Sequence, residues 1–469
     1  MNGPRGTRTR DCWHRPLAQQ IGYLYFINVN MSFRFKPTEL QHFNWMFNLA
    51  PCFPINATKI NIITDPRKFY ETLCERFQNA KRRISLASLY IGTGELEKKL
   101  LEVTVHNIKN NDVNFQVLLD YQRGTRGKFN SLTLFQQFVS NVSDRCNLAL
   151  YQTPRLHGFW SKALPSRYNE IIGLQHMKLY IADDSVILSG ANCSNDYFHQ
   201  RQDRYIEIQD VDLANFYSEL IGMEAVSCCI CFFFFKLQYY FYVLIVAIFL
   251  QFCFLDQSDN NTWVFPLIQM GEFKINQDEQ ATCNILSSAP KGSYFRLATG
   301  YFNLTEKYAK ILLRDCKASI SLLMAHPNAN GFQGAAGPAG GIPHAYSLIA
   351  RFWQKVVEYN QSCRVQVLEY ERPGWTFHAK GLWYYPPGSG VPWATVVGSA
   401  NLGERSVRRD LEAQVPLDVT ANVRLTFVLL YDSWETALKL TGITGTCHEM
   451  ALQYFNFETV RHENKLYIF

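Results

Sequence analysis

Two histidine–lysine motifs are the part of this chain whose residue types best suit chemistry. Each motif places a histidine two positions before a lysine and is followed by a small-residue turn that ends in asparagine. The six residues are His176, Lys178, Asn192, His378, Lys380 and Asn401. One motif alone fits the polar edge of a strand, because alternate strand positions face the same way. Two copies with similar spacing favour a shared function instead.

The six residues together suit a tetrahedral phosphate. Lysine ammonium groups offset charge on the non-bridging oxygens, and asparagine amides donate hydrogen bonds to them. One neutral imidazole can attack phosphorus while a second, protonated imidazole gives a proton to the leaving oxygen. Imidazole titrates near neutral pH, so one ring can serve in each form. No carboxylate or cysteine cluster with metal-ligand spacing accompanies either motif, so the sequence predicts no metal and no other cofactor.

A nucleophilic histidine also needs an acceptor for its far ring nitrogen. Glu207 follows His176 by 31 residues, and Glu412 follows His378 by 34 residues. Both glutamates end short segments that begin with aspartate and resemble each other. We therefore predict that Glu207 and Glu412 orient the two imidazoles, the alternative for each being a solvated strand residue.

The two motifs belong to a pattern that occurs twice in the chain, at an offset of about 200 residues. The matched apolar segments are 84–90 with 295–301, 115–119 with 320–324, and 148–151 with 365–368. Short strands that alternate with helical segments indicate an α/β fold. We therefore predict two similar domains in a pseudo-two-fold arrangement, with one shared active site at their interface.

The duplication divides the chain of 469 residues into five parts. We expect a basic N-terminal segment at 1–42, a first repeat at 43–224, a hydrophobic insert at 225–262, a second repeat at 263–440 and a C-terminal tail at 441–469. The N-terminal segment is rich in arginine and poor in acids, as mitochondrial presequences are, although a disordered basic tail has the same composition. The net charge of +6 permits an anionic partner without demanding one.

The apolar block at 228–255 within the insert is long enough to cross a bilayer. A single span would place His176 and His378 on opposite sides of the membrane, which is incompatible with a shared site. The block is therefore expected to be a surface-lying or re-entrant hairpin, a buried segment, or a stretch absent from the natural protein. Absence is the favoured interpretation, because the block is low in complexity and lies between two well-patterned halves.

The first motif, extended to Asp183 and Gly190, resembles the HxKx4Dx6G signature of the phospholipase D superfamily. In the second copy Tyr385 stands where the aspartate would fall. The aspartate of the superfamily is mainly structural, so its loss there need not abolish activity. The resemblance places Asp183 among the motif residues and favours His176, whose copy is complete, as the nucleophile.

Within the superfamily, the chain most resembles the eukaryotic mitochondrial CDP-diacylglycerol–glycerol-3-phosphate 3-phosphatidyltransferases. The stretches that carry this resemblance are 87–94, 201–205, 299–305, 374–381 and 405–414. It implies transfer of a phosphatidyl group from CDP-diacylglycerol to sn-glycerol 3-phosphate, which gives phosphatidylglycerophosphate and CMP. This is the committed step toward cardiolipin, and it would pass through a phosphohistidine-type covalent intermediate.

The resemblance also implies where the protein works and with what. Family members act on a lipid substrate at the matrix face of the inner mitochondrial membrane, without needing a membrane span. We expect no nucleic-acid partner and no metal, because two lysines and two imidazoles already offset the phosphate charge. Three alternatives remain open from the sequence. They are a hydrolase of the same fold (a phospholipase D or a phosphodiesterase), a cardiolipin synthase of the bacterial type, and a non-catalytic membrane scaffold.

A weaker candidate site for nucleotide binding follows the first matched segment. It consists of Ala87, Ser88, Leu89, Tyr90, Ile91, Gly92, Thr93 and Gly94. The equivalent stretch of the family is sometimes assigned to nucleotide binding, and backbone donors at the start of a helix can hold a phosphate. No Lys-Ser/Thr pair follows, so the stretch is not a Walker loop. A plain strand-to-helix turn is the favoured alternative.

Overall fold

The computed structural model describes residues 35, 37–156, 172–229, 262–331 and 346–418. Our expectations for the basic N-terminal segment, for the apolar block from residue 230 onward and for the tail after residue 418 lie outside these residues. Among the described residues, no helix combines the length and apolar character needed to cross a membrane.

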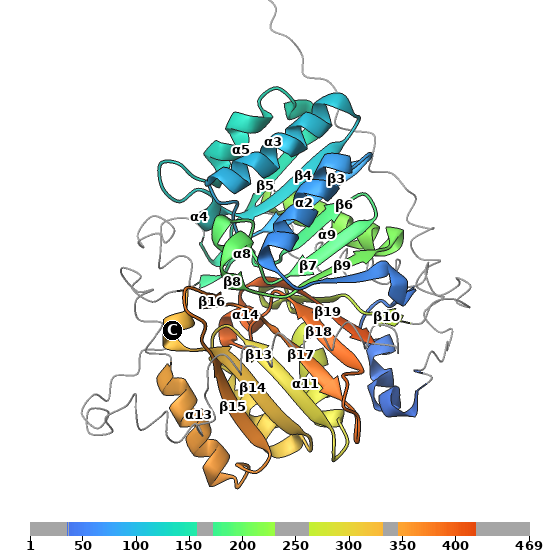
Figure 1. Ribbon diagram of the computed structural model, residues 1–469, viewed down its shortest axis with the longest axis vertical. Coiled ribbons are helices and arrows are strands. Elements are labelled where there is room, and N and C mark those ends of the chain that lie inside the picture. The colour runs from blue at the N-terminus through green and yellow to red at the C-terminus, as the bar shows by residue number, and fades with distance from the viewer. Residues whose placement is uncertain (1–34, 36, 157–171, 230–261, 332–345, 419–469) are drawn as a thin grey trace, which may run out of the picture.

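The first half of the chain forms a seven-stranded sheet, drawn above the second half in Figure 1. The strands, in order across the sheet, are β2 (Ile60–Ile63), β9 (Tyr205–Gln209), β7 (Ser185–Ser189), β6 (Leu179–Ala182), β3 (Arg83–Ser88), β4 (Asn114–Asp120) and β5 (Cys146–Tyr151). Strands β3, β4 and β5 pair in parallel, and the other neighbours pair antiparallel.

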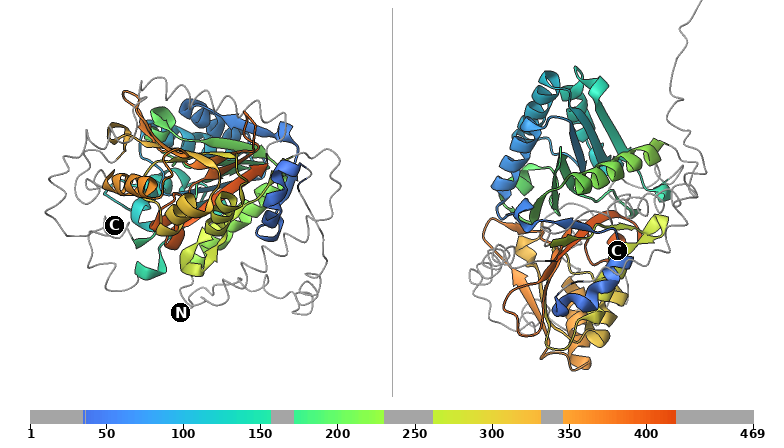
Figure 2. Two further views of the ribbon diagram at one scale, coloured as in Figure 1. Left: turned by 90° about the horizontal axis from the view of Figure 1, so that it is seen from below. Right: turned by 90° about the vertical axis from the view of Figure 1, so that its right-hand side faces the viewer.

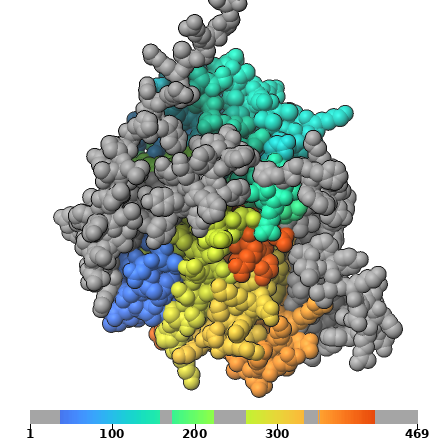
Figure 3. All heavy atoms as spheres, turned by 180° about the vertical axis from the view of Figure 1, so that it is seen from behind, coloured from blue at the N-terminus to red at the C-terminus, as the bar shows by residue number. Residues whose placement is uncertain are grey.

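A ten-stranded sheet contains most of the second half. Its main path is β1 (Phe53–Ile55), β10 (Thr262–Val264), β19 (Leu411–Asp418), β18 (Ala394–Gly398), β17 (Gly381–Tyr385), β13 (Tyr294–Thr299), β14 (Ser319–Ala325) and β15 (Val365–Tyr370). The short strands β11 (Leu267–Met270) and β12 (Ile275–Asn276) branch from β19. Figure 3 shows the same division from behind, with first-half residues in teal above second-half residues in yellow and orange.

Six strands follow each other in the same order and with the same directions in both sheets. The order β9-β7-β6-β3-β4-β5 of the first sheet corresponds to β19-β18-β17-β13-β14-β15 of the second. In each sheet the last three strands are parallel and the others antiparallel. The mixed α/β class expected from the sequence is therefore confirmed.

Helices pack against both sheets, as Figure 2 shows. The α-helices are α2 (Pro66–Asn79), α3 (Glu95–Asn110), α4 (Tyr121–Gly124), α5 (Ser131–Val139), α8 (Asn195–His199), α9 (Val211–Cys229), α11 (Gln277–Ser288), α12 (Glu306–Lys310), α13 (Tyr346–Glu358) and α14 (Glu404–Arg408). Local sequence explains the start of α2: Asp65 accepts from the backbone N–H groups of Arg67 and Lys68, and Pro66 opens the helix.

Shorter elements connect these helices and strands. The 3-10 helices are η2 (Thr38–Asn48), η3 (Ala57–Lys59), η4 (Ser143–Arg145), η5 (Pro154–Leu156), η6 (Gly271–Phe273) and η8 (Pro327–Ala329), and η7 (Ile311–Asp315) is a π-helix. Strand β8 (Arg201–Gln202) pairs in parallel with β16 (Thr376–Phe377). This pair joins the first half to the second immediately before His378.

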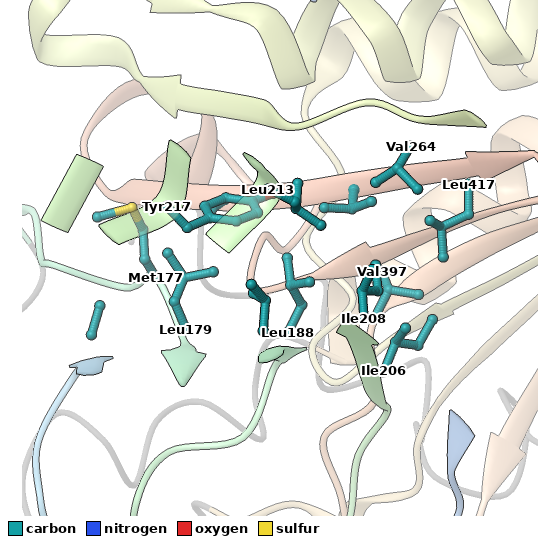
Figure 4. Packing of buried hydrophobic residues seen from close by; sticks show 14 of the residues in the cluster. Met177, Leu179, Leu188, Ile206, Ile208, Leu213, Tyr217, Val264, Val397 and Leu417 are labelled. Carbon is teal, nitrogen blue, oxygen red and sulfur yellow. The ribbon is translucent and has the colours of Figure 1, made fainter. Parts of the chain in front are cut away.

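An apolar core fills the space between the two halves. Figure 4 shows Met177 and Ile208 of the first half in one cluster with Val397 and Leu417 of the second, and all four are almost fully buried. Burial of such side chains stabilises a fold by about 1.5–3 kcal/mol each. The continuous core explains why the halves form one body.

The expected start of the first repeat at residue 43 is wrong. The 3-10 helix Thr38–Asn48 packs its buried residues Phe43 and Phe47 against the second-half core rather than the first sheet. Strand β1 likewise pairs with β10 of the ten-stranded sheet. The first sheet begins only at β2. An apolar segment does not reveal from sequence alone which of two similar cores it will join.

Arg204 of the first half inserts into the second sheet. Its guanidinium donates to the carbonyl of Val396 at 2.8 Å and to the hydroxyl of Thr395 at 2.8 Å, and it lies 3.8 Å from the ring centroid of Trp383. Gly381 makes room for it, because a Cβ there would lie 2.0 Å from Arg204 Nη1 and 2.3 Å from a backbone oxygen. Gly381 also has a φ of +138°, which side chains rarely adopt.

We predict that Gly381→Ala lowers the free energy of unfolding by about 3 kcal/mol or more, because backbone strain and displacement of a buried arginine add. Denaturant unfolding followed by circular dichroism measures the change. Gly390→Ala is the matched control, since a Cβ there meets no atom within 4 Å. Equal stability of the two variants would contradict the role given to Gly381.

Candidate active site

Each histidine–lysine motif is held by backbone hydrogen bonds to the opposite half. The N–H of His176 donates to the carbonyl of Leu411 at 2.9 Å, and the N–H of Leu411 donates to the carbonyl of Leu174 at 2.8 Å. In the same way, the N–H of His378 donates to the carbonyl of Gln202 at 2.8 Å. Both histidines are therefore fixed at the boundary between the halves, and both are 5% exposed.

The carboxylates that contact the imidazoles are exchanged between the halves. Nδ1 of His176 lies 2.9 Å from both carboxylate oxygens of Glu412, and Nδ1 of His378 lies 2.7 Å from Oδ2 of Asp203. A buried carboxylate on Nδ1 leaves Nε2 of the ring directed elsewhere and stabilises an imidazolium when one forms. Each half thus supplies the orienting group for the histidine of the other.

The predicted role of Glu207 is wrong, and Asp203 occupies the position instead. The Glu207 carboxylate accepts from Arg76 Nε at 2.6 Å, Ser185 Oγ at 2.7 Å and Asn61 Nδ2 at 3.2 Å, all within the first half. These donors fully engage it, and they hold its pKa below the ordinary value despite its burial. Glu207 supports the first sheet rather than the site.

Strand register explains which carboxylates are equivalent. Leu411 pairs with Gln175, the residue before His176, and Gln202 pairs with Phe377, the residue before His378. The residues that follow Leu411 and Gln202 are Glu412 and Asp203, so these two correspond. Sequence spacing suggested Glu207 because 31 and 34 residues are similar separations. The strand pairing shows instead that the equivalent of Glu412 is Asp203, four positions before Glu207.

The surroundings of the two carboxylates explain the small residues after each motif. A Cβ on Gly190 would lie 2.7 Å from Asp203 Oδ1, so glycine lets this carboxylate approach His378. In the corresponding turn of the second half, Ser399 Oγ donates to Glu412 at 2.5 Å. Ser406 Oγ donates to the other oxygen of Glu412 at 2.8 Å. Both carboxylates are therefore fixed in place.

The two lysines are almost fully buried beside the histidines. Lys380 Nζ lies 2.8 Å from the carbonyl of His378 and 3.1 Å from its Nε2, and Lys178 Nζ donates to the carbonyl of His176 at 2.5 Å. Burial lowers the pKa of Lys178 well below 10.5 and that of Lys380 to about 8. A phosphate bound here would stabilise the charged ammonium form of both lysines, which burial disfavours.

The surroundings of both imidazoles favour the neutral form of the ring in the free site. Burial lowers the pKa of each ring well below 6.5, and the neighbouring ammonium of Lys178 or Lys380 lowers it further. Desolvation outweighs the carboxylates in lowering each pKa, and the expected use of one protonated ring stays a prediction for the phosphate-bound site. A neutral ring that donates through Nδ1 keeps a lone pair on Nε2.

The two histidines differ at Nε2. Among the described residues, no hydrogen bond reaches Nε2 of His176, whereas Nε2 of His378 lies 3.3 Å from the hydroxyl of Tyr197. The same hydroxyl accepts from Asn192 Nδ2 at 3.2 Å. In the second half, the backbone N–H of Asn401 donates to Ser406 Oγ at 3.1 Å. Both asparagines are buried, and Asn192 reaches His378 of the other motif through Tyr197.

Asp183 does not belong to the site, although the motif includes it. It sits in the turn between β6 and β7 with a φ of +49°. Its carboxylate accepts from the backbone N–H groups of Lys81 and Arg82 at 2.8 Å and of Arg83 at 3.2 Å. Asp183 is therefore a structural residue that fixes the start of β3, which corrects its place among the catalytic candidates.

The stretch from Ala87 to Gly94 does not offer a phosphate site at its helix. Glu97, which is 1% exposed, turns back over the start of α3 and accepts from the N–H of Asn195 at 2.6 Å. A Cβ on Gly92 would lie 2.0 Å from the Glu97 carboxylate. A buried carboxylate at this place repels an anion. The glycines make room for Glu97, so the strand-to-helix turn is the better description.

A metal ion was not expected, but His176, Asp410 and Glu412 place one ligand atom each within 4.8 Å of one another. The expectation that no carboxylate cluster suited to a metal accompanies the motifs is therefore not met. Both carboxylates already have protein donors: Asp410 accepts from Arg405 Nε at 2.9 Å and from the N–H of Leu174 at 3.0 Å. Ser399 and Ser406 donate hydrogen bonds to the two oxygens of Glu412. These bonds fit a charge-balanced hydrogen-bond network better than a metal site.

Several residues that position the site escaped the sequence interpretation. Asp203 and Tyr197 contact His378, Arg405 donates to Asp410, and Asp120 accepts from the N–H of Gln175 at 3.1 Å. Asp203 and Arg405 carried a sequence signal, because they lie in the stretches 201–205 and 405–414 that resemble the family. Tyr197 and Asp120 have no local spacing that links them to a motif.

The fold agrees with that of a solved enzyme, and no protein-family model matches the chain. The crystal structure of phosphatidylserine synthase from Haemophilus influenzae matches with a TM-score of 0.63 at 21% identity, over 81% of this chain and 87% of that one. This similarity, together with the paired histidine–lysine motifs, defines a phospholipase D-like protein.

Curated relatives identify the family within that class. The mitochondrial CDP-diacylglycerol–glycerol-3-phosphate 3-phosphatidyltransferase of Homo sapiens is 38% identical over 83% of this chain and 79% of its own length. The Mus musculus enzyme of the same name is 37% identical over 81% and 78%. A probable enzyme of this kind from Dictyostelium discoideum is 35% identical over 83% and 74%. The chain belongs to the family of CDP-diacylglycerol–glycerol-3-phosphate 3-phosphatidyltransferases.

We predict that Asp203→Asn lowers turnover by about 10²–10⁴-fold, because the amide no longer stabilises a charged His378 ring. Glu207→Gln is the matched control: it should lose about 1–3 kcal/mol of unfolding free energy with its partly exposed Arg76 pair, yet keep near-normal turnover per folded molecule. Turnover and denaturant unfolding are measured on both variants. The assignment of Asp203 fails if Glu207→Gln is the less active enzyme per folded molecule.

Proposed function

We propose that this protein transfers a phosphatidyl group from CDP-diacylglycerol to sn-glycerol 3-phosphate and releases CMP. The proposal rests on one observation above all: two buried histidines each contact a carboxylate of the opposite half, and each lies beside a buried lysine of its own motif. Relatives named for this reaction match over most of the chain. The matched strand orders of the two sheets support two phospholipase D-like domains in a pseudo-two-fold arrangement around this site.

The first step attaches the phosphatidyl group to His176. Its Nε2 carries the lone pair and has no hydrogen-bond partner among the described residues, so it attacks phosphorus of the phosphatidyl group. The bond from that phosphorus to the bridging oxygen breaks, and CMP leaves with the electron pair. Glu412 stabilises the positive charge that develops on the ring. The product is a phosphohistidine-type intermediate.

His378 acts as the acid and then as the base. The negative diphosphate of the substrate raises the pKa of His378, so the ring takes up a proton when substrate binds and gives it to the leaving CMP oxygen. The neutral ring then accepts the proton of the glycerol hydroxyl, which attacks phosphorus and breaks the P–N bond. Lys178 and Lys380 offset charge on the non-bridging oxygens. His176 returns unchanged, and phosphatidylglycerophosphate leaves.

The place of action follows the substrates and the relatives. The relatives from animals are named mitochondrial. We place this chain at the matrix face of the inner mitochondrial membrane, as a protein that contacts the membrane surface to reach its lipid. CDP-diacylglycerol and glycerol 3-phosphate are the partners that the site chemistry requires, and no role for nucleic acid follows from it.

We predict that His176→Ala and His378→Ala each abolish the release of CMP in the presence of glycerol 3-phosphate, because each removes one half of the proton and phosphoryl transfer. A quench after incubation with labelled CDP-diacylglycerol alone should leave a phosphatidyl adduct on His176. An adduct on His378 would reverse the assignment of nucleophile and acid. Release of phosphatidic acid from phosphatidylcholine, with no response to glycerol 3-phosphate, would identify a hydrolase instead.

We also predict that turnover survives exhaustive chelation, because the oxygens of Asp410 and Glu412 are engaged by protein donors. CMP release is measured in EDTA and after addition of magnesium or manganese. Unchanged rates fit the two-histidine mechanism. Loss in chelator that either ion restores would show that His176, Asp410 and Glu412 hold a metal.

A further inference from the structure

A short loop beside the site carries exposed aromatic and basic side chains together. The segment 121–130, which we name the aromatic–basic loop, runs from the end of β4 through α4 to the start of α5. Phe129 is 50% exposed and Tyr121 is 41% exposed, although large apolar side chains are normally covered. Arg126 and Lys128 are exposed between them. Few large hydrophobic side chains are exposed among the described residues, and two of them, Tyr121 and Phe129, lie in this one short loop.

The fold holds the aromatic–basic loop in a fixed shape. The side-chain amide of Asn130 donates to the carbonyls of Thr125 at 3.1 Å and Gly127 at 2.8 Å, which closes the loop on itself. Asn130 and Thr133 also form a reciprocal cap at the start of α5. Phe129 is therefore presented to solvent by a formed structure and not by a loose end.

The aromatic–basic loop borders the candidate active site. Its first residue follows Asp120, whose carboxylate accepts from the N–H of Gln175, the residue before His176. Arg123 lies 4.5 Å from the ring centroid of Tyr90. The Tyr90 hydroxyl in turn lies 3.2 Å from Ser194 Oγ, two residues after Asn192. A surface that touched this loop would lie next to the phosphate site.

The charged side chains in and directly after the aromatic–basic loop are all positive. From residue 121 to residue 143 the sequence contains Arg123, Arg126 and Lys128 and no aspartate or glutamate. Cations beside a bilayer are attracted to anionic headgroups, and aromatic rings settle at the boundary between headgroups and acyl chains. A rigid loop with both features fits a lipid surface better than a protein groove, which would have to cover Phe129 with a matching pocket.

We propose that the aromatic–basic loop docks the protein on a bilayer that contains anionic phospholipid, with Phe129 in the interface and Lys128 on headgroup phosphates. The proposal rests on the proposed function, since a diacyl substrate must pass from a bilayer into the site. Docking at this loop brings the end of β4, where Asp120 contacts the residue before His176, close to the membrane, so that the lipid need not leave the bilayer completely before its phosphate reaches the site.

The test uses the full-length protein and vesicles of two compositions, phosphatidylcholine alone and phosphatidylcholine mixed with phosphatidylglycerol. Phe129→Ser should weaken binding to the anionic vesicles by about 10-fold and Lys128→Gln by about 5-fold, the second effect fading at high salt. Val357→Ser and Lys355→Gln are matched controls, because these residues are equally exposed at the end of α13. The controls should bind as the wild type does.

A second readout separates docking from chemistry. Turnover of CDP-diacylglycerol presented in vesicles should fall in Phe129→Ser in proportion to binding, whereas turnover of a monomeric short-chain substrate should stay at the wild-type rate. Equal vesicle binding by Phe129→Ser and the wild type, or an equal loss in Val357→Ser, overturns the proposal. If no variant transfers a phosphatidyl group but the binding differences remain, the proposed function fails and the docking surface stands.

Discussion

The burial of charge at the boundary between the two halves is the constraint on which the site depends. Lys178 and Lys380 are 1% exposed, and a buried ammonium is costly unless carboxylates stand close to it. Glu412 and Asp203 lie in the same buried space, where each also holds an imidazole of the opposite half. The same low dielectric that lowers the pKa of both histidines makes each of these charges act strongly on a bound phosphate.

The rest of the interface packs around this charged centre and holds the two halves in a fixed arrangement. The apolar cluster that includes Met177 and Val397 continues across the boundary (Figure 4), so apolar side chains of both sheets pack together beside the charged centre. Arg204 adds hydrogen bonds to backbone of the second sheet and stacks on Trp383. These contacts fix the distance between the halves, and that distance sets the separation of the two histidines.

Much of the architecture could be predicted from the sequence because it is local. Apolar runs and turns located the strands, and the repeated motifs located His176 and His378. The orienting residues could not be placed in this way, because Glu412 and Asp203 reach the site through pairing between distant strands. Spacing within one half therefore favoured Glu207, which supports its own sheet. The predictions for Asp183 and Gly92 failed for a related reason. A sequence motif contains residues that shape the backbone as well as residues that face the substrate, and spacing alone does not separate the two kinds.

The exchange of carboxylates has a consequence for how the two halves can vary. A fragment that contains only the first half keeps His176 but loses the group that orients it, and the complementary fragment has the same defect. A substitution of Glu412 or Asp203 in one half acts directly on the histidine of the other half. The crossed contacts therefore make the chemistry of each half depend on the other.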